Sequence, residues 1–428
     1  MTAEIAILNK SAVALAADSK VTMTIGGRQK TYDTVDKVFS LSKTEPVGAM
    51  IYGNAEFMRF PWETILKEYR RQRPRKSFPT IFDWADDILA YLAGFFPFDE
   101  KDDVEAAKRI TENATEELIA TLINLAEAGQ DFAEIEQMVV AEFENQIDEL
   151  SAQDDYFTEG QWADLEPRLR TIFDTAHERG AAASFPTAAE AIKTFSALLI
   201  RKRAISGSSS GLVIAGFGED ELLPSLVSYE IDGLFNGTLK LKERNRVDST
   251  RDSEGAIVPF AQVDMVYRFM EGIDPSLASD IFGSLSHLLV QNSADTARAL
   301  GKTAEQVERL MPAFESATAA ALKEFWSSMT GLRRTNFVDP IVDMAMRLPK
   351  DELAHMAESL VSLTSLQRRV SREVETVGGA IDVAVISKGD GLVWIRRKHY
   401  FNPDRNLRFV NGYFSEYGSG RKGGGDDD

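Results

Sequence analysis

Residues 2–19 read TAEIAILNKSAVALAADS, two short runs of small and apolar residues separated by the polar cluster Asn9-Lys10-Ser11. Runs of this length and composition, joined by turn-forming residues, predict a β-hairpin. The apolar segments Val38–Leu41 and Val47–Tyr52 continue the pattern, and no helical periodicity interrupts residues 2–53. We therefore expect these segments to form one β-sheet.

Helical spacing of apolar residues begins after these strands. The segments Pro61–Arg73 and Ile81–Leu92 each repeat large apolar residues at intervals of three and four, which predicts two helices that cover the sheet. Between Asp99 and Arg203 the composition shifts to long acidic segments with helical periodicity, for example Glu134–Leu150. This composition indicates an inserted helical subdomain.

Strand patterns return in the second half of the chain, at Leu212–Phe217, Leu226–Ile231 and Thr238–Leu241, with turn signals at Asp232-Gly233 and Asn236-Gly237. We expect these strands to form a second sheet. A hairpin made of Ile381–Ile386 and Leu392–Arg397, which turns at Gly389-Asp390-Gly391, should complete that sheet.

The helices of the second half follow the same periodicity. Val263–Met270 predicts a short helix, Ala278–Leu348 a second helical insertion, and Asp351–Glu375 a long amphipathic helix that stops at Gly378-Gly379.

The order of these elements predicts an α+β fold in which two sheets pack face to face and helices cover both outer surfaces, an αββα four-layer sandwich with two large helical insertions. The predicted segments are residues 2–98 (first part of the core), 99–205 (acidic helical insertion), 206–274 (core continued), 275–349 (second helical insertion), 350–415 (last core helix and hairpin) and 416–428 (a disordered Gly- and Asp-rich tail).

Composition limits the classes of function. The formal net charge of -19 repels nucleic acid and anionic lipid, so we expect neither a nucleic-acid nor a membrane partner. The absence of cysteine excludes disulfides, thiolate metal sites and a cysteine nucleophile, and fits a reducing compartment. With no signal-peptide pattern and no apolar run of about 20 residues, the sequence predicts a soluble, cytoplasmic protein.

Two further patterns carry no chemistry in their sequence context. The segment Gly207–Gly211 matches the G-x-S-x-G motif around Ser209, but strand-like residues follow it where a nucleophile elbow requires a helix. The four histidines are far apart in the sequence and form no i, i+3 or i, i+4 pair, so we expect no metal site.

The N-terminal region carries the pattern that indicates chemistry. Thr2 follows Met1 directly, and a small second residue permits removal of methionine, which would give the Thr2 hydroxyl a free α-amine on the same residue. Ala16-Ala17-Asp18-Ser19 ends the second predicted strand, Lys37 precedes another, and Met50–Ala55 leads toward a helix. In this order and near this spacing, residues 2–73 resemble the proteasome β-subunit and its simpler bacterial relatives, the N-terminal-nucleophile (Ntn) hydrolases.

This resemblance implies a threonine-type amide-bond hydrolase. Thr2 would be the nucleophile and its α-amine the base, since an α-amine has a pKa near 8. Lys37 would lie beside Thr2 and lower the pKa of that amine, and Asp18 would hold Lys37 charged and oriented. The backbone of Tyr52 and Gly53 would stabilise the oxyanion. No cofactor is implied.

The chain departs from the family around the terminal amine. Where active β-subunits carry a Ser, and an Asp and Ser pair near the last helix, this chain reads Val258-Pro259-Phe260 and Glu373–Val377. The candidates for support of the amine are therefore Ser19, Glu373, Glu375 and Thr376. Tyr52 replaces the first oxyanion glycine and places a bulky side chain near the substrate path.

Three functions remain open at this point. The first is a threonine peptidase that assembles as a homo-oligomeric ring, as the family does; the sequence does not indicate whether it has an ATPase partner. The second is an Ntn amidohydrolase that acts on small amides. The third is a catalytically silent assembly protein that uses its acidic helices to bind a partner. Retention of Thr2, Asp18 and Lys37 together argues against silence.

Overall fold

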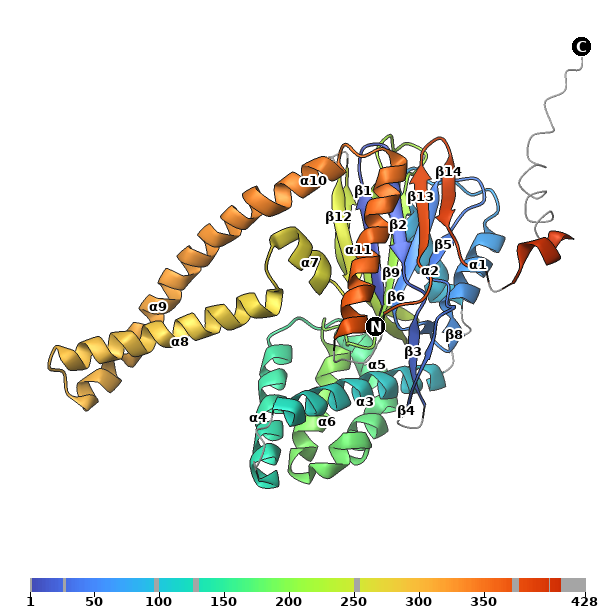
Figure 1. Cartoon of the computed structure of the whole chain (residues 1–428). Coiled ribbons are helices and arrows are strands. Elements are labelled where there is room, and N and C mark those ends of the chain that lie inside the picture. The colour runs from blue at the N-terminus through green and yellow to red at the C-terminus, as the bar shows by residue number, and fades with distance from the viewer. Residues whose placement is uncertain are drawn as a thin grey trace, which may run out of the picture.

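The strands form two five-stranded antiparallel sheets, and the fold is mixed α and β (Figure 1). The structure is a computed structural model that describes residues 2–25, 28–95, 100–125, 131–249, 255–371, 377–399 and 401–408. The predicted tail 416–428 lies outside the described residues. Among the helices that are described, none combines the length and the apolar composition needed to cross a bilayer.

The first sheet has the N-terminal hairpin at its centre. Its strands, in spatial order, are β12 (Ala256–Ala261), β1 (Ala3–Leu8), β2 (Val13–Ala17), β13 (Asp382–Ser387) and β14 (Gly391–Arg396). The hairpin predicted from residues 2–19 is confirmed: β1 and β2 pair in antiparallel register, with Glu4 opposite Ala17 and Leu8 opposite Val13.

The second sheet draws on both halves of the chain. Its strands, in spatial order, are β11 (Thr238–Asp248), β10 (Ser225–Phe235), β9 (Ser210–Gly216), β6 (Val47–Gly53) and β5 (Val38–Ser40). The predicted division of the strands was therefore wrong in two places: β5 and β6 leave the first sheet, and the C-terminal hairpin β13–β14 joins it. Strand pairing is a non-local choice, and local periodicity does not encode it.

A second correction concerns Asp232-Gly233, which is not a turn. Strand β10 continues through it to Phe235 with a register irregularity between Ile231 and Gly233, and Asp232 is buried. The turn lies at Asn236-Gly237, as predicted, where both residues have positive φ.

The two sheets share one buried cluster. Its members come from β1, β2, β12 and β13 on one side and from β5, β6, β9 and β10 on the other, and include Ala6, Leu8, Met50, Val213 and Ala384. Because side chains alternate along a strand, Thr2 and Glu4 lie on the same face of β1 as Ala6 and Leu8 and point toward the second sheet.

Helices cover the outer surface of each sheet. Helices α1 (Trp62–Gln72) and α2 (Ile81–Phe95) pack on the second sheet around Trp62, Tyr69 and Trp84. Helices α7 (Asp264–Glu271) and α11 (Lys350–Val370) pack on the first sheet around Ile5, Leu353 and Leu360. The helix predicted to reach Glu375 ends at Val370, and residues 372–376 lie outside the described part of the chain.

The first helical insertion has a core of its own. It comprises α3 (Glu100–Leu125), α4 (Phe132–Ser151), α5 (Glu159–Asp174), three short 3-10 turns (Ala176–Glu178, Gly180–Ser184 and Pro186–Ala188) and α6 (Ala189–Arg201). These helices bury an apolar cluster that contains Phe143, Leu165 and Phe195 and that reaches Phe235 of β10.

The second insertion is an arm. Helices α8 (Pro275–Ala299) and α9 (Ala304–Arg333) extend away from the sheets, and a π-helical turn (Arg334–Val338) and α10 (Asp339–Ala345) lead back to α11 (Figure 1). The smaller elements are the two-stranded pairs β3 (Val21–Ile25) with β4 (Arg28–Tyr32) and β7 (Glu56–Phe57) with β8 (Phe60–Pro61), and a final 3-10 turn, Pro403–Arg405.

Candidate active site

Asp18 lies at the centre of the candidate site, directly after β2. Its Oδ1 accepts a 2.6 Å hydrogen bond from Lys37 Nζ and a 3.1 Å bond from the backbone N–H of Ala3, while its Oδ2 accepts from the N–H of Gly378 at 2.9 Å. The side chains of Lys37 and Asp18 are 4% and 0% exposed. A buried ion pair with additional backbone donors has a fixed geometry, so the Lys37 ammonium has little freedom to move.

The same contacts fix the start of the chain. The N–H of Ala3 donates to the Asp18 carboxylate, and the N–H of Asp18 donates to the Ala3 carbonyl at 3.1 Å. On the other side, the N–H of Gln262 donates to the Thr2 carbonyl, also at 3.1 Å. Thr2 is buried, and its hydroxyl has no hydrogen-bond partner among the described residues. A buried hydroxyl without a partner is costly in a purely structural role.

Glu4 belongs to the same site, although the sequence analysis did not select it. It is buried, and both of its carboxyl oxygens lack a partner among the described residues. Burial raises the pKa of Glu4 well above its usual value; Lys37 opposes the rise, Asp18 adds to it, and the nearby Thr2 hydroxyl opposes it. No hydrogen bond of normal geometry joins Thr2 and Glu4, so the influence of the Thr2 hydroxyl on the Glu4 pKa reflects only that the two side chains lie close together.

We expect Glu4→Gln to change how stability depends on pH. A raised pKa in the folded state means that the stability contributed by Glu4 is present below the unfolded value of about 4.3 and is lost as pH rises through the folded pKa. The free energy of unfolding of the wild type, measured in urea, should therefore fall relative to the variant as the pH rises from about 4.3 through the raised pKa of folded Glu4. Glu305→Gln, at an exposed position, is the control. Parallel pH profiles for wild type and Glu4→Gln would contradict this expectation.

Tyr52 and Gly53 are the last two residues of strand β6, and Tyr52 contacts the residue that pairs with Glu4. The Tyr52 ring stacks on Phe260 with centroids 5.5 Å apart, and Phe260 is the β12 residue opposite Glu4. Burial raises the pKa of the Tyr52 hydroxyl, and the charges of Glu230 and Glu4 add to the rise. The ring lies so close to Gly211 that a Cβ there would come within 2.1 Å of it. Tyr52 thus forms one wall of the site.

Gly53 has a φ of +73°, and a Cβ at this position would lie 2.4 Å from the Ser209 carbonyl. Only glycine fits both the left-handed conformation and the close approach. The next residue continues the contact, because the N–H of Asn54 donates to that carbonyl at 3.2 Å. The segment before β9 therefore determines where the Tyr52–Asn54 backbone lies.

The remaining predicted site residues are placed differently. Ser19 is buried and donates its hydroxyl to the Ala380 carbonyl, while its N–H donates to the Gly378 carbonyl at 3.2 Å. Ser19 thus ties the Gly378-Gly379 turn to the end of β2 instead of facing Thr2. Glu373, Glu375 and Thr376 lie outside the described residues.

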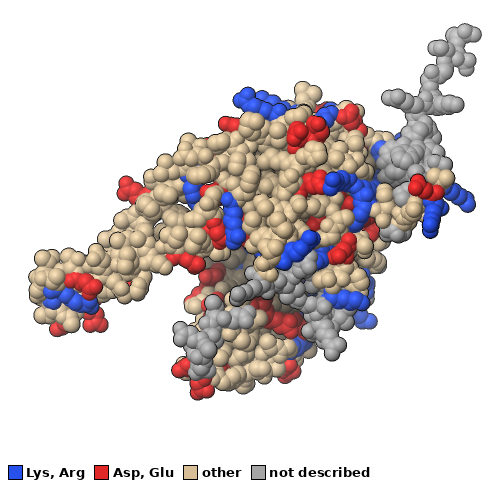
Figure 2. Space-filling view, viewed as in Figure 1, with Lys and Arg blue, Asp and Glu red and all other residues tan. Residues whose placement is uncertain are grey.

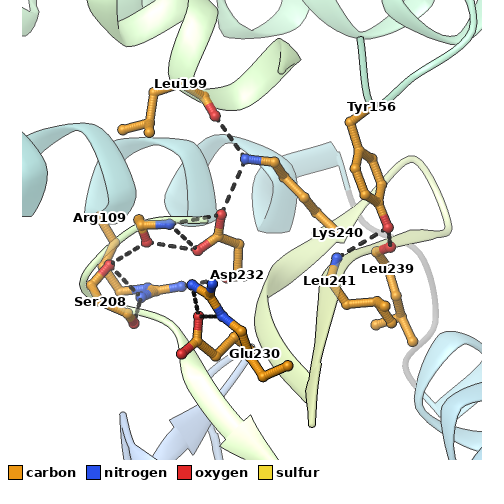
Figure 3. A network of polar contacts seen from close by, with 11 residues as sticks. Arg109, Tyr156, Leu199, Ser208, Glu230, Asp232, Leu239, Lys240 and Leu241 are labelled. Carbon is orange, nitrogen blue, oxygen red and sulfur yellow. Dashed lines mark hydrogen bonds and ion pairs between the residues drawn. The ribbon is translucent and has the colours of Figure 1, made fainter. Parts of the chain in front are cut away.

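A buried polar network holds the segment 206–210 in place (Figure 3). Arg109 of α3 donates to the Ser208 carbonyl at 2.8 Å and to the Asp232 carbonyl at 2.7 Å. The Asp232 carboxylate accepts from the Ser206 hydroxyl at 2.6 Å and pairs with Lys240 Nζ at 3.1 Å. The first helical insertion is in this way linked to the strand segment that contacts Gly53 and Asn54.

Lys240 is the most buried cation of this network. It is 0% exposed and donates a second bond, of 2.7 Å, to the Leu199 carbonyl at the end of α6 (Figure 3). Burial lowers the pKa of Lys240, and the Asp232 carboxylate opposes that change. Ser209, the centre of the G-x-S-x-G match, precedes strand β9 and not a helix, so this segment is not a nucleophile elbow.

A cavity of about 770 Å³ opens next to this segment. It begins at Asn54 and runs between the β7–β8 turn and the first helical insertion; its lining includes Glu56, Arg59, Asp102, Glu105 and Arg109. Within the described part of the chain, no group of three or more His, Asp or Glu side chains is arranged to bind a metal ion.

Comparison of the sequence with models of known protein families finds no match, and comparison with curated protein sequences finds none either.

Proposed function

We propose that this chain is a threonine-type amide-bond hydrolase that uses Thr2, after removal of Met1, as its nucleophile. The observation that carries the proposal is the buried Lys37–Asp18 pair: Asp18 accepts from the backbone N–H of Ala3, the residue that follows Thr2, and the Thr2 hydroxyl has no partner among the described residues. A buried cation fixed beside a hydroxyl favours the alkoxide that attack on an amide requires.

The arrangement of layers supports the same proposal. Two antiparallel sheets share a core, and separate apolar clusters join each sheet to its own outer helices. We propose that this is the αββα sandwich of the Ntn hydrolases, in which the nucleophile begins the central hairpin of one sheet. Thr2 immediately precedes β1, the second strand in the order of the first sheet.

The proposed reaction needs no group beyond the chain itself. The α-amine of Thr2 accepts the hydroxyl proton, and Oγ1 attacks the carbonyl carbon of the amide. In this proposal Lys37 stabilises the alkoxide, and a backbone N–H of the Tyr52–Gly53 segment stabilises the oxyanion. The Thr2 α-ammonium then protonates the leaving amine as the amide C–N bond breaks, which leaves the acyl-enzyme ester on Oγ1. Water, deprotonated by the same α-amine, hydrolyses this ester and frees Oγ1. The raised pKa of Glu4 favours its protonated form, so it competes less with the substrate for Lys37.

The cavity beside Asn54 favours a peptide over a small amide as the substrate. Its volume of about 770 Å³ falls in the range of sites that hold ligands of many atoms, and its lining carries both acidic and basic side chains. Its lining includes Asn54, which follows Gly53, but not Thr2, Asp18 or Lys37, so a peptide attacked by Thr2 would have to extend past Gly53 to enter it.

We expect the purified protein to begin at Thr2, because the proposed base is an α-amine that exists only after Met1 is removed. Intact-mass measurement of active protein should give the chain without Met1. Active protein that retains Met1 would contradict the assignment of the base. Protein that keeps full activity after its α-amine is chemically blocked would contradict it as well.

The nucleophile can be tested without knowing the substrate. A β-lactone should acylate Thr2: Oγ1 attacks the ring carbonyl, the ring C–O bond breaks, and the released oxygen takes the proton. Peptide mapping should locate the ester on Thr2 of the wild type, and Thr2→Ala should carry none. Equal labelling of both proteins, or an ester on another residue, would refute the proposal.

A further inference from the structure

The arm formed by α8 and α9 (Pro275–Arg333) has almost no core of its own. The buried residues of its two helices, which have 25 and 30 residues, are Ala278, Ala294, Ala297, Val307, Thr318 and Leu322. The helices α3–α6 of the first insertion, in contrast, bury many large side chains together. Helices in water depend on such packing for most of their stability, so the arm lacks a contact that helices of this length usually have.

The arm exposes apolar stripes instead. On α8, Leu277, Ile281 and Leu288 recur at intervals of four and seven, which places them on one face. On α9, Phe325, Met329 and Leu332 recur at intervals of four and three. All six are between 36% and 60% exposed.

The two stripes lie along the same part of the arm. Phe282 of α8 and Trp326 of α9 pack edge to face with ring centroids 5.5 Å apart. A shallow groove follows the α8 stripe, and its lining consists of Leu277, Ile281, Leu285 and Leu288 together with Asp280 and Ser284. Of the twenty large exposed hydrophobic side chains among the described residues, seven lie in the arm. Such a concentration marks an interaction surface.

The low net charge of the arm indicates which partner covers its apolar stripes. The arm has six acidic and five basic residues, a net charge of -1, whereas the whole chain carries -19. No Asp, Glu, Lys or Arg lies between Asp280 and Asp295. The arm is mostly free of charged side chains in Figure 2, with charges gathered near its tip. A second copy of the chain would be repelled by the body of the molecule, and the arm is where it meets no such repulsion.

We propose that the arms of two copies pack against each other along these stripes. At 1.5 Å per residue, α8 is about 38 Å long, and a face two helices wide has an area of about 750 Å². A stable interface buries about 800 Å² on each partner, so one face of the arm is large enough. The contact is symmetric, because each arm offers the stripes that the other covers. It joins the copies at a distance from Thr2 and does not depend on the proposed catalytic function.

The test is the mass of the full-length protein by light scattering at micromolar concentration, for wild type and for Leu277→Glu/Leu288→Glu. Each copy then carries two charged side chains inside the proposed apolar contact, so the dissociation constant should rise about 100-fold or more and the average mass should fall by half. The double variant Leu222→Glu/Leu407→Glu places the same change at two exposed leucines outside the arm and should keep the wild-type mass.

Fluorescence transfer between copies gives a second reading. The chain contains no cysteine, so Lys302→Cys, at an exposed position between α8 and α9 and outside both stripes, provides a single thiol for a donor or acceptor dye, and mixed labelled copies should show transfer. A wild-type protein whose mass stays at 47.5 kDa overturns the proposal. This holds even if the arm of that monomer binds lipid vesicles or an unfolded protein, because the arm would then serve a different partner. An oligomer that survives Leu277→Glu/Leu288→Glu, with circular dichroism showing folded protein, overturns it equally.

Discussion

The Lys37→Ala protein should be acylated at Thr2 about 100-fold to 10,000-fold more slowly than the wild type. The ammonium of Lys37 is buried and bonded to Asp18 at 2.6 Å, so its field acts on the Thr2 hydroxyl through little water. Rates of β-lactone labelling and of peptide-amide hydrolysis should fall together. Lys242→Ala, which alters an exposed lysine of β11, should leave both rates unchanged.

Lys37→Arg distinguishes a catalytic role of the Lys37 ammonium from the effect of leaving the buried Asp18 without a cation. It keeps a cation for Asp18, and so should preserve the fold, but a planar guanidinium cannot replace a compact ammonium in so closed a site. We therefore expect a folded and nearly inactive protein. A folded Lys37→Ala protein that is labelled as fast as the wild type would overturn the assignment of Lys37.

The sequence led to three residues of the candidate site because each stands at a strand boundary in the order of a known family. Glu4 was not predicted as a site residue for a physical reason. In a strand taken alone, a charged residue between apolar ones is expected on the solvent-facing side of the sheet. The same alternation puts Glu4 on the face of Thr2, Ala6 and Leu8, and this was the signal that could have identified it. Burial of that face becomes visible only when the second sheet is in place.

Local patterns predicted the helices α1, α2 and α4 to within a few residues, because a single helix carries its own periodicity. They did not predict which strands pair. β12 was not predicted at all. It contains Pro259, a residue that central strands disfavour, and the structure puts it at the edge of the first sheet, where proline is tolerated. The extension of β10 through Asp232 depends on Lys240 and Ser206, partners that no local pattern reveals.

That buried pair leads to the second large effect that we expect. Lys240→Met removes the ammonium but keeps most of the side-chain volume, and it leaves the Asp232 carboxylate buried without its cation and the Leu199 carbonyl without its donor. The free energy of unfolding should fall by about 3–5 kcal/mol. Lys242→Met, two residues along the same strand and exposed, should change it by less than about 0.5 kcal/mol.

The cause of that loss can be tested by adding a second substitution at Asp232. In Lys240→Met/Asp232→Asn the buried charge is gone, while the amide oxygen can still accept from the Ser206 N–H and hydroxyl, which lie 3.1 and 2.6 Å from Asp232 Oδ1. Removing an uncompensated buried charge is favourable, so the double variant should be more stable to urea than Lys240→Met alone. If the main loss were instead the packing of the lysine stem against its neighbours, the second substitution would add its own cost. A double variant that is less stable than Lys240→Met would therefore show that the charge pair is not what holds α6 and α3 to the second sheet.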